Sequence, residues 1–166
     1  MELGLTFPLQ RFLRYNALPR GIEADRRLCW DLHVITLRGQ KSLLAVHCHS
    51  RYAFVRFAPS PAQWRDPAGL FFVGLRESLC DAGFSPARIE DAFCHAGAVQ
   101  FTRTHGRREV AFLNRAWEDV LALDLCLDPD GEAQPLLDHA VNTRASRCAG
   151  CEGLGTGLER MAEMLG

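Results

Sequence analysis

The sequence predicts an α+β fold in a single domain that covers residues 1–166. Three observations lead to this prediction. The chain has 166 residues, 48% hydrophobic and 23% charged, which suits one hydrophobic core rather than two. Short stretches typical of β-strands stand beside longer stretches with helical periodicity. Their order indicates a largely antiparallel sheet of about five strands, with helices packed on one face of it.

The N-terminal segment predicts a strand and then a helix. Residues 1–6 can form a short strand, and Thr6 can cap a helix that has Pro8 in its first turn. The side of this helix that faces the core is apolar, with Leu9, Phe12 and Leu13. A polar connection precedes the next strand.

Three strands in a row form the predicted centre of the sheet. Residues 30–37, 42–47 and 52–57 are rich in Val, Leu, Phe and Tyr, and short polar segments separate them. Runs of this length with short connections are typical of an antiparallel meander. We expect these strands and a later one at 99–104 to belong to one sheet.

Helix-start signals divide the middle of the chain. A residue that favours the N-cap stands directly before proline in Ser60-Pro61, Asp66-Pro67 and Ser85-Pro86. The second signal opens a helix that Gly83 can end, and the third opens a short helix that ends near Gly97. The apolar side of the first of these two helices carries Leu70, Phe71, Leu75 and Leu79.

The last third of the chain predicts mainly helices. The strand at 99–104 leads into a helix over about 107–123, and another helix is expected at 133–141. A final helix begins after Thr156, because Thr156 and Glu159 match the capping-box pattern.

Charge and composition exclude several classes of protein. The net charge is −1 and the pI about 6.6, so any contact with nucleic acid would be a local patch. No segment is long and apolar enough for a signal peptide or a membrane span, which predicts a cytoplasmic protein without membrane contact. The seven cysteines are an odd number and lie mostly in apolar patterns, which favours reduced thiols over disulfides.

The segment QFTRTHGRREVAFLNRAW contains the best candidate for a binding site. Arg103 ends an apolar row of the strand, and Thr104 points to its other face. Arg107 and Arg108 fall in the first helical turn, where free backbone N–H groups already carry partial positive charge. Cations there oppose folding slightly, but a phosphate or carboxylate would be held by the N–H groups and the guanidinium groups together.

Asn114 follows Arg107 by two helical turns, so both can border one cleft. The alternative is structural. Arg107 would then form an ion pair with a carboxylate of this chain, and Asn114 would satisfy a buried backbone group.

The segment with Cys148 and Cys151, nine residues after His139, has residue types that bind zinc. It is only half of a site, because nothing in the sequence places a second pair of ligands there. The available candidates are Cys126, His47 and His49. We therefore predict no metal and no other cofactor, with reduced cysteines or a redox dithiol as the two readings of the motif.

Three segments carry a resemblance to known sequences: LAVHCHSRYAFVRF, LFFVGLRESLCDAGFSPARIE and, most specifically, FTRTHGRREVAFLN. The last fits the pattern F-T-[KR]-T-x-x-R-x-x-x-x-x-x-N. Together they resemble a bacterial family, domain of unknown function 6933, over most of the chain. The matching residues are Trp30, Lys41, Arg51, Tyr52, Thr102, Thr104, Arg107 and Asn114, whereas Asp31, His33 and His47 depart from the pattern. The resemblance implies a small bacterial protein and no particular activity.

Trp30 and Lys41 complete the predicted ligand-binding set. The indole of Trp30 can serve as a stacking platform for a ligand, or it can anchor the sheet.

Three classes of function remain open. The first is a binding module for an anionic small molecule, such as a nucleotide, or for the end of a nucleic acid. The second is a hydrolase or transferase that uses His33, His47 or His105 as acid or base beside Arg107. The third is a structural protein with an unknown protein partner. A histidine near the arginines inside a pocket would favour the enzyme, and an open basic rim would favour the binding module.

Overall fold

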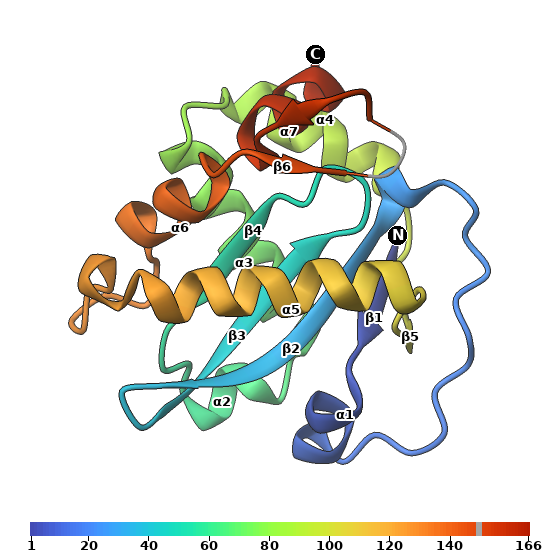
Figure 1. Cartoon of the computed structure of the whole chain (residues 1–166). Helices are drawn as coiled ribbons and strands as arrows, with labels where there is room; N and C mark the ends of the chain where they lie inside the picture. Colours follow the sequence, from blue (N-terminus) through green and yellow to red (C-terminus); the bar gives the residue numbers. More distant parts are fainter. Residues whose placement is uncertain (149–150) are drawn as a thin grey trace.

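Five strands form one sheet in the order β4-β3-β2-β1-β5 (Figure 1). The computed structural model describes residues 1–148 and 151–166. The strands are β1 (Glu2–Leu5), β2 (Cys29–Leu37), β3 (Gln40–His47), β4 (Ala53–Arg56) and β5 (Gln100–Arg103). The sequence predicted that the segments of β2, β3, β4 and β5 share one sheet, and this prediction is confirmed.

The sheet is mixed, so the prediction of a largely antiparallel sheet is wrong. β1 lies between β2 and β5 and is parallel to both, with Leu3 opposite Trp30 and Phe101. β2 with β3 and β3 with β4 are antiparallel. The parallel pairs arise because helical and irregular segments return the chain to the same end of the sheet before β2 and again before β5.

Helices cover both faces of the sheet, which corrects the expectation of one covered face (Figure 1). The described helices are α1 (Phe7–Leu13), α2 (Pro61–Trp64), α3 (Pro67–Asp81), α4 (Pro86–Ala96), α5 (Arg107–Ala122), α6 (Pro135–Asn142) and α7 (Gly157–Leu165). Helices α3, α4 and α7 pack on one face, and α5 and α6 pack on the other. Both faces need a cover because successive residues of β3 are buried on opposite sides, Leu43 on one and Leu44 on the other.

Four predicted helix starts are confirmed by their caps, whereas Thr6 makes no side-chain cap hydrogen bond at the start of α1. Asp66 accepts a hydrogen bond from the backbone N–H of Gly69 at 2.9 Å, and Ser85 accepts one from Arg88. Ser60 and Thr156 each form a capping box. These contacts satisfy N–H groups that the first helical turn leaves without partners. The described helices include none with the length and apolar character required to cross a membrane.

Four short elements complete the described structure. Three-residue 3₁₀ helices occur at η1 (Arg26–Leu28) and η2 (Asp124–Cys126), and β6 (Ser146–Arg147) pairs with β7 (Leu154–Gly155).

The face of β2 beneath α5 changes character along the strand. Ile35 and Leu37 belong to the apolar core, whereas Cys29, Asp31 and His33 bury polar or ionisable groups on the same face. This polar end of β2 lies under the connection between β5 and α5, where the sequence predicted a binding site.

Candidate functional site

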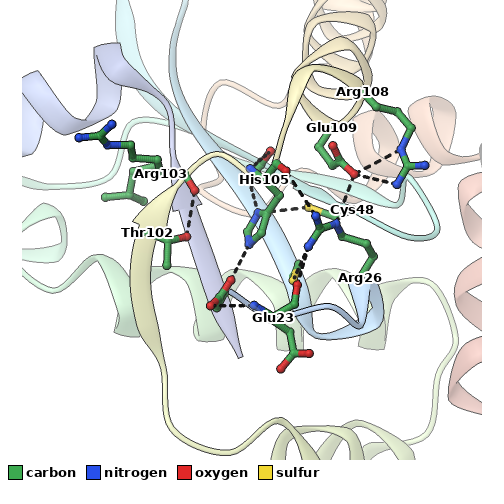
Figure 2. Close-up of polar contacts among 12 residues, drawn as sticks. Glu23, Arg26, Cys48, Thr102, Arg103, His105, Arg108 and Glu109 are labelled. Atoms are coloured by element: carbon green, nitrogen blue, oxygen red, sulfur yellow. Dashed lines mark hydrogen bonds and ion pairs between the residues drawn. The ribbon is translucent and has the colours of Figure 1, made fainter. Parts of the chain in front are cut away.

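The N-terminus of α5 already holds a carboxylate of this chain. Glu109 is buried, and its Oε1 lies 2.9 Å from Arg108 Nη2 and 3.4 Å from Arg26 Nε. Figure 2 shows both arginines reaching this carboxylate. Burial opposes the charged form, but hydrogen bonds from its own backbone amide and from Arg108 lower the pKa of Glu109. The helix terminus is therefore partly neutralised from within, although Arg107 is exposed beside it.

Among the described residues, no hydrogen bond or ion pair joins Arg103, Thr104 or Asn114 to that carboxylate. The Nε of Arg103 donates to the backbone oxygen of Leu18 at 2.9 Å, and Thr104 is half-buried. Asn114 is exposed on α5. The structure therefore does not bring the predicted set together in one cleft.

Trp30 is a core residue, which corrects its prediction as a ligand-binding residue. Its side chain is 2% exposed, and its ring packs against Phe54 and Phe71 with centroids 5.8 and 5.3 Å away. The burial follows from strand alternation, since the even-numbered residues of β2 face the core beneath α3.

Lys41 lies at the opposite end of the sheet from Arg107. It stands opposite Thr36 in the β2–β3 hairpin, and its Nζ donates to the Thr36 hydroxyl at 2.9 Å. Thr36 follows Asp31 by five strand residues, a distance of roughly 16 Å. Lys41 therefore belongs to a different surface of the molecule.

That surface contains a cleft, which we call the hairpin cleft. Its volume is about 810 Å³, and it lies among α1, the β2–β3 hairpin and the segment around α2. Its side chains include three cations and three aromatic rings and no carboxylate: Arg14, Lys41, Arg65, Phe12, Tyr15 and Trp64.

The hairpin cleft has a partly preformed floor and a strained rim. The rings of Phe12 and Trp64 meet edge to face, with centroids 4.9 Å apart, and Trp64 is largely buried. Arg14 and Ala58 both adopt left-handed backbone conformations, with φ of 61° and 49°. Such conformations cost energy in residues other than glycine, and they cluster at binding sites.

A second cleft, of about 440 Å³, borders α5 on the other face of the molecule. Its charged lining residues are Arg51, Arg115, Arg144, Arg147 and Asp119. Asp119 lies 2.7 Å from Arg144 and 3.6 Å from Arg115, so it neutralises part of this charge. The guanidinium of Arg51 covers one face of the Phe112 ring, 4.7 Å from its centroid.

A buried group of ionisable side chains lies beneath the β5–α5 connection. We call it the His105 cluster, and it consists of Glu2, Cys29, Asp31, Cys48 and His105. His105 Nδ1 lies 2.7 Å from Asp31 Oδ1 and 3.6 Å from Cys48 Sγ, and its Nε2 lies 3.2 Å from Glu2 Oε2. Figure 2 shows the imidazole reaching in from the connection toward Cys48.

The electrostatics of the His105 cluster follow from its burial. Burial disfavours a charged imidazole, but hydrogen bonds to Asp31 and to the two thiols outweigh it and raise the pKa of His105 to about 12. Burial also raises the pKa of Asp31, and the contact with His105 acts in the opposite direction. We take the charged pair as the form present at neutral pH, since His105 contacts two carboxylates.

The histidines proposed as acids or bases do not line either large cleft. His33 Nδ1 is 2.8 Å from the Thr6 hydroxyl, and His47 contacts Ser50. Burial lowers the pKa of His47 to about 4, so it is neutral. The side chain of His105 is only 1% exposed. Neither cleft therefore brings one of these histidines together with Arg107.

The Cys148–Cys151 motif is described only in part, because its two central residues lie outside the described residues. The Cys148 thiol donates to the backbone oxygen of His49 at 3.0 Å. The groups of possible metal ligands found among residues 1–148 and 151–166 include neither cysteine of this motif.

Sequence reasoning missed the residues around Lys41 and the members of the His105 cluster other than His105 itself. Arg14, Trp64 and Arg65 come from segments that were assigned only as helix and connection. One usable signal existed for the cluster: Asp31 occupies a strand position that the alternation of β2 places inside.

Residues 3–150 match the family model described as Domain of unknown function (DUF6933). The chain belongs to this family. The DUF6933 match includes every lining residue of the hairpin cleft and every member of the His105 cluster except Glu2. No curated protein matches the chain.

Proposed function

We propose that this protein binds a nucleotide or a similar phosphate-bearing molecule with a flat ring, and that the hairpin cleft holds it. The observation that carries the proposal is the lining of that cleft, where three cations and three rings stand together without a carboxylate. A cleft of about 810 Å³ is within the range of small-molecule sites.

The three cations supply the contacts for phosphate. The whole chain has a net charge of −1, so a cleft with Arg14, Lys41 and Arg65 and no acid is a local concentration of positive charge. Hydrogen bonds from charged groups contribute about 1.5–3 kcal/mol each. Guanidinium groups also match the geometry of phosphate oxygens.

The rings supply the contact for the base. Phe12 is 40% exposed and Tyr15 is half-buried, so both can offer a ring to a base, and stacking of a base on an aromatic side chain contributes about 1–3 kcal/mol. The position of the cleft agrees with this use, since it lies beyond the carboxyl ends of the parallel strands β1 and β2. We infer a cytoplasmic location, where nucleotides are available.

Titration calorimetry tests the proposal with three probes: ADP, adenosine and inorganic pyrophosphate. Lys41→Ala is expected to weaken the binding of ADP and of pyrophosphate by roughly 10- to 150-fold, because it removes a phosphate contact. The affinity for adenosine should stay unchanged. Tyr15→Ala is expected to weaken the binding of ADP and adenosine and to leave the binding of pyrophosphate unchanged, because it removes a ring that lines the cleft.

Arg107→Ala is the matched control, because Arg107 is an exposed cation outside the cleft. It is expected to leave all three affinities unchanged. If Arg107→Ala lowers the affinity for ADP and Lys41→Ala does not, the ligand binds at the helix terminus predicted from the sequence. Absence of binding by all three probes contradicts the proposal. A 5′-phosphorylated oligonucleotide that binds more tightly than ADP would identify a nucleic-acid end as the ligand.

A further inference from the structure

We propose that the His105 cluster is a binding site for one zinc-like transition-metal ion, with Asp31, Cys48 and His105 as its ligands. The inference is independent of the nucleotide proposal, since no member of the cluster lines the hairpin cleft.

The three ligand atoms already surround one point. They are Asp31 Oδ1, Cys48 Sγ and His105 Nδ1, and they all lie within 4.8 Å of one another. A tetrahedral zinc ion with bonds of about 2.0–2.3 Å separates its ligand atoms by roughly 3.3–3.8 Å. The distance of 3.6 Å between Nδ1 and Sγ fits this spacing, and the 2.7 Å between Nδ1 and Oδ1 has to widen by under about 1 Å.

The donor types also favour such an ion. Thiolate, imidazole and carboxylate together are ligands of zinc and of related transition metals, and they do not suit Mg²⁺ or Ca²⁺. Three protein ligands leave a fourth position of a tetrahedral ion for water or another donor. Cys29 is buried on the other side of the same imidazole, close to Glu2 and His105.

Glu2 holds the imidazole in the way that metal-bound histidines require. A histidine that binds a metal through one ring nitrogen usually donates its other N–H to a carboxylate. His105 Nε2 lies 3.2 Å from Glu2 Oε2, and Glu2 Oε1 accepts hydrogen bonds from the backbone amides of Ile22 and Glu23. The carboxylate is thus fixed in place, and it directs Nδ1 toward Asp31 and Cys48.

Two glycines give the cluster its space. A methyl group at Gly4 would collide with Asp31 Oδ1 and His105 Nδ1, and one at Gly21 would collide with Glu2 Oε2. Both positions therefore bring bare backbone against the buried polar atoms. Residues 21–25 form no helix or strand, and their opening would admit an ion.

The competing explanation is a purely structural ion triad, in which His105 carries both ring protons and bridges Asp31 and Glu2. In that explanation Cys48 only packs as a small apolar side chain, because Asp31 already accepts the Nδ1 proton at the shorter distance. The metal site uses both contacts at once, and this difference makes the thiol the deciding group.

Cobalt(II) titration of the metal-free, full-length protein provides the test, because cobalt reports its ligands in the absorption spectrum. We expect one cobalt ion per chain, with absorption typical of a tetrahedral site and a thiolate-to-cobalt charge-transfer band. Cys48→Ser should remove the charge-transfer band. Glu2→Gln should keep the band and weaken the affinity by about 10- to 100-fold, as expected for a residue that positions a ligand.

The controls separate this site from the other cysteines. Cys80→Ser changes an exposed thiol on α3, and Cys151→Ser changes the partly described motif. Both variants should keep the cobalt spectrum. Circular dichroism of each metal-free variant verifies its fold. A second measurement uses the wild-type protein alone. Zinc should protect Cys48 from alkylation, which mass spectrometry detects.

Three results would overturn the proposal. They are the absence of cobalt binding, a charge-transfer band that survives in Cys48→Ser, and a band that disappears in Cys151→Ser. If Cys48→Ser does not fold, alkylation of Cys48 at equal rates with and without zinc would overturn it as well.

Discussion

Asp138 is a carboxylic acid that the fold keeps in its interior. Its Oδ1 accepts a hydrogen bond from the backbone N–H of Val55 at 2.9 Å, and its Oδ2 accepts one from the Ser78 hydroxyl at 2.9 Å. Burial raises the pKa of Asp138 to about 8, against the effect of these hydrogen bonds. At neutral pH the folded protein therefore holds a proton that the unfolded chain releases.

This proton makes stability depend on pH in a definite direction. Between the usual pKa of about 4 and the folded pKa of about 8, the folded state binds more protons, so the free energy of unfolding falls as pH rises. Asp138→Asn removes the ionisation and can keep both contacts. We expect the stability of the wild type relative to this variant to decrease by on the order of a few kcal/mol from pH 4.5 to pH 8, as measured by urea unfolding.

Asp130→Asn serves as the comparison, since Asp130 is exposed in the turn after η2. Its stability relative to the wild type should change little over the same pH range. If the free energies of unfolding of the wild type and of Asp138→Asn differed by the same amount at every pH, Asp138 would be ionised in the folded protein.

At single residues, sequence reasoning succeeded for local roles and failed for those set by distant contacts. The caps Asp66 and Ser85 depend on residues three positions away, and both were predicted. The His105 cluster joins four separate stretches of chain, and no spacing in the sequence reveals which of them meet. Lys41 was predicted as a ligand-binding residue, but its neighbours in the hairpin cleft come from α1 and the segment around α2, which the sequence did not bring together with it.

Among the elements, α3 illustrates how much a local signal determines. The helix begins at Pro67 because Asp66 caps it, and it buries Leu70, Phe71 and Leu75 against the sheet. Both the start and the apolar side were predicted from the sequence, because they depend on helical geometry alone.

The cap of α3 yields a stability prediction. Asp66→Ala is expected to lower the free energy of unfolding by about 0.5–2 kcal/mol, because the backbone N–H of Gly69 loses its partner and the helix terminus loses a negative charge. Urea unfolding at pH 7 measures the effect. Asp66→Asn retains an N-cap acceptor and should lose less stability than Asp66→Ala. Equal losses of stability in the two variants would show that the hydrogen bond contributes nothing.

Local sequence patterns did not determine all of the strand directions. The meander of β2, β3 and β4 was predicted correctly, since short connections force antiparallel neighbours. The pairing of β1 with β5 was not predicted, because alternation along a strand is the same whether its neighbour is parallel or antiparallel.

For the whole molecule, the two-sided burial of the sheet separates the candidate sites. The His105 cluster lies under the start of α5, the hairpin cleft lies at the far end of β2, and the apolar cores fill the space on both faces. Composition predicted one core in a single domain, but the division of helices between the faces depends on crossovers that composition does not encode.

The pairing of β1 also delays folding during synthesis, which can be measured on stalled ribosomes. Glu2 lies opposite Gln100, 98 positions later in the chain (100 − 2). Chains with only residues 1–98 outside the ribosome are expected to be digested rapidly by protease, because one side of β1 has no partner. Equal protease resistance of these chains and of complete released chains would contradict this expectation.

At a synthesis rate of about 5–20 residues per second, the 98 positions correspond to roughly 5–20 s. During this time β1 presents unpaired backbone groups beside side chains that become fully buried in the finished protein, such as Leu3 and Leu5. The strand made first is thus completed among the last, and each new copy of the protein passes through an interval in which chaperones and neighbouring nascent chains compete with β5 for the same edge.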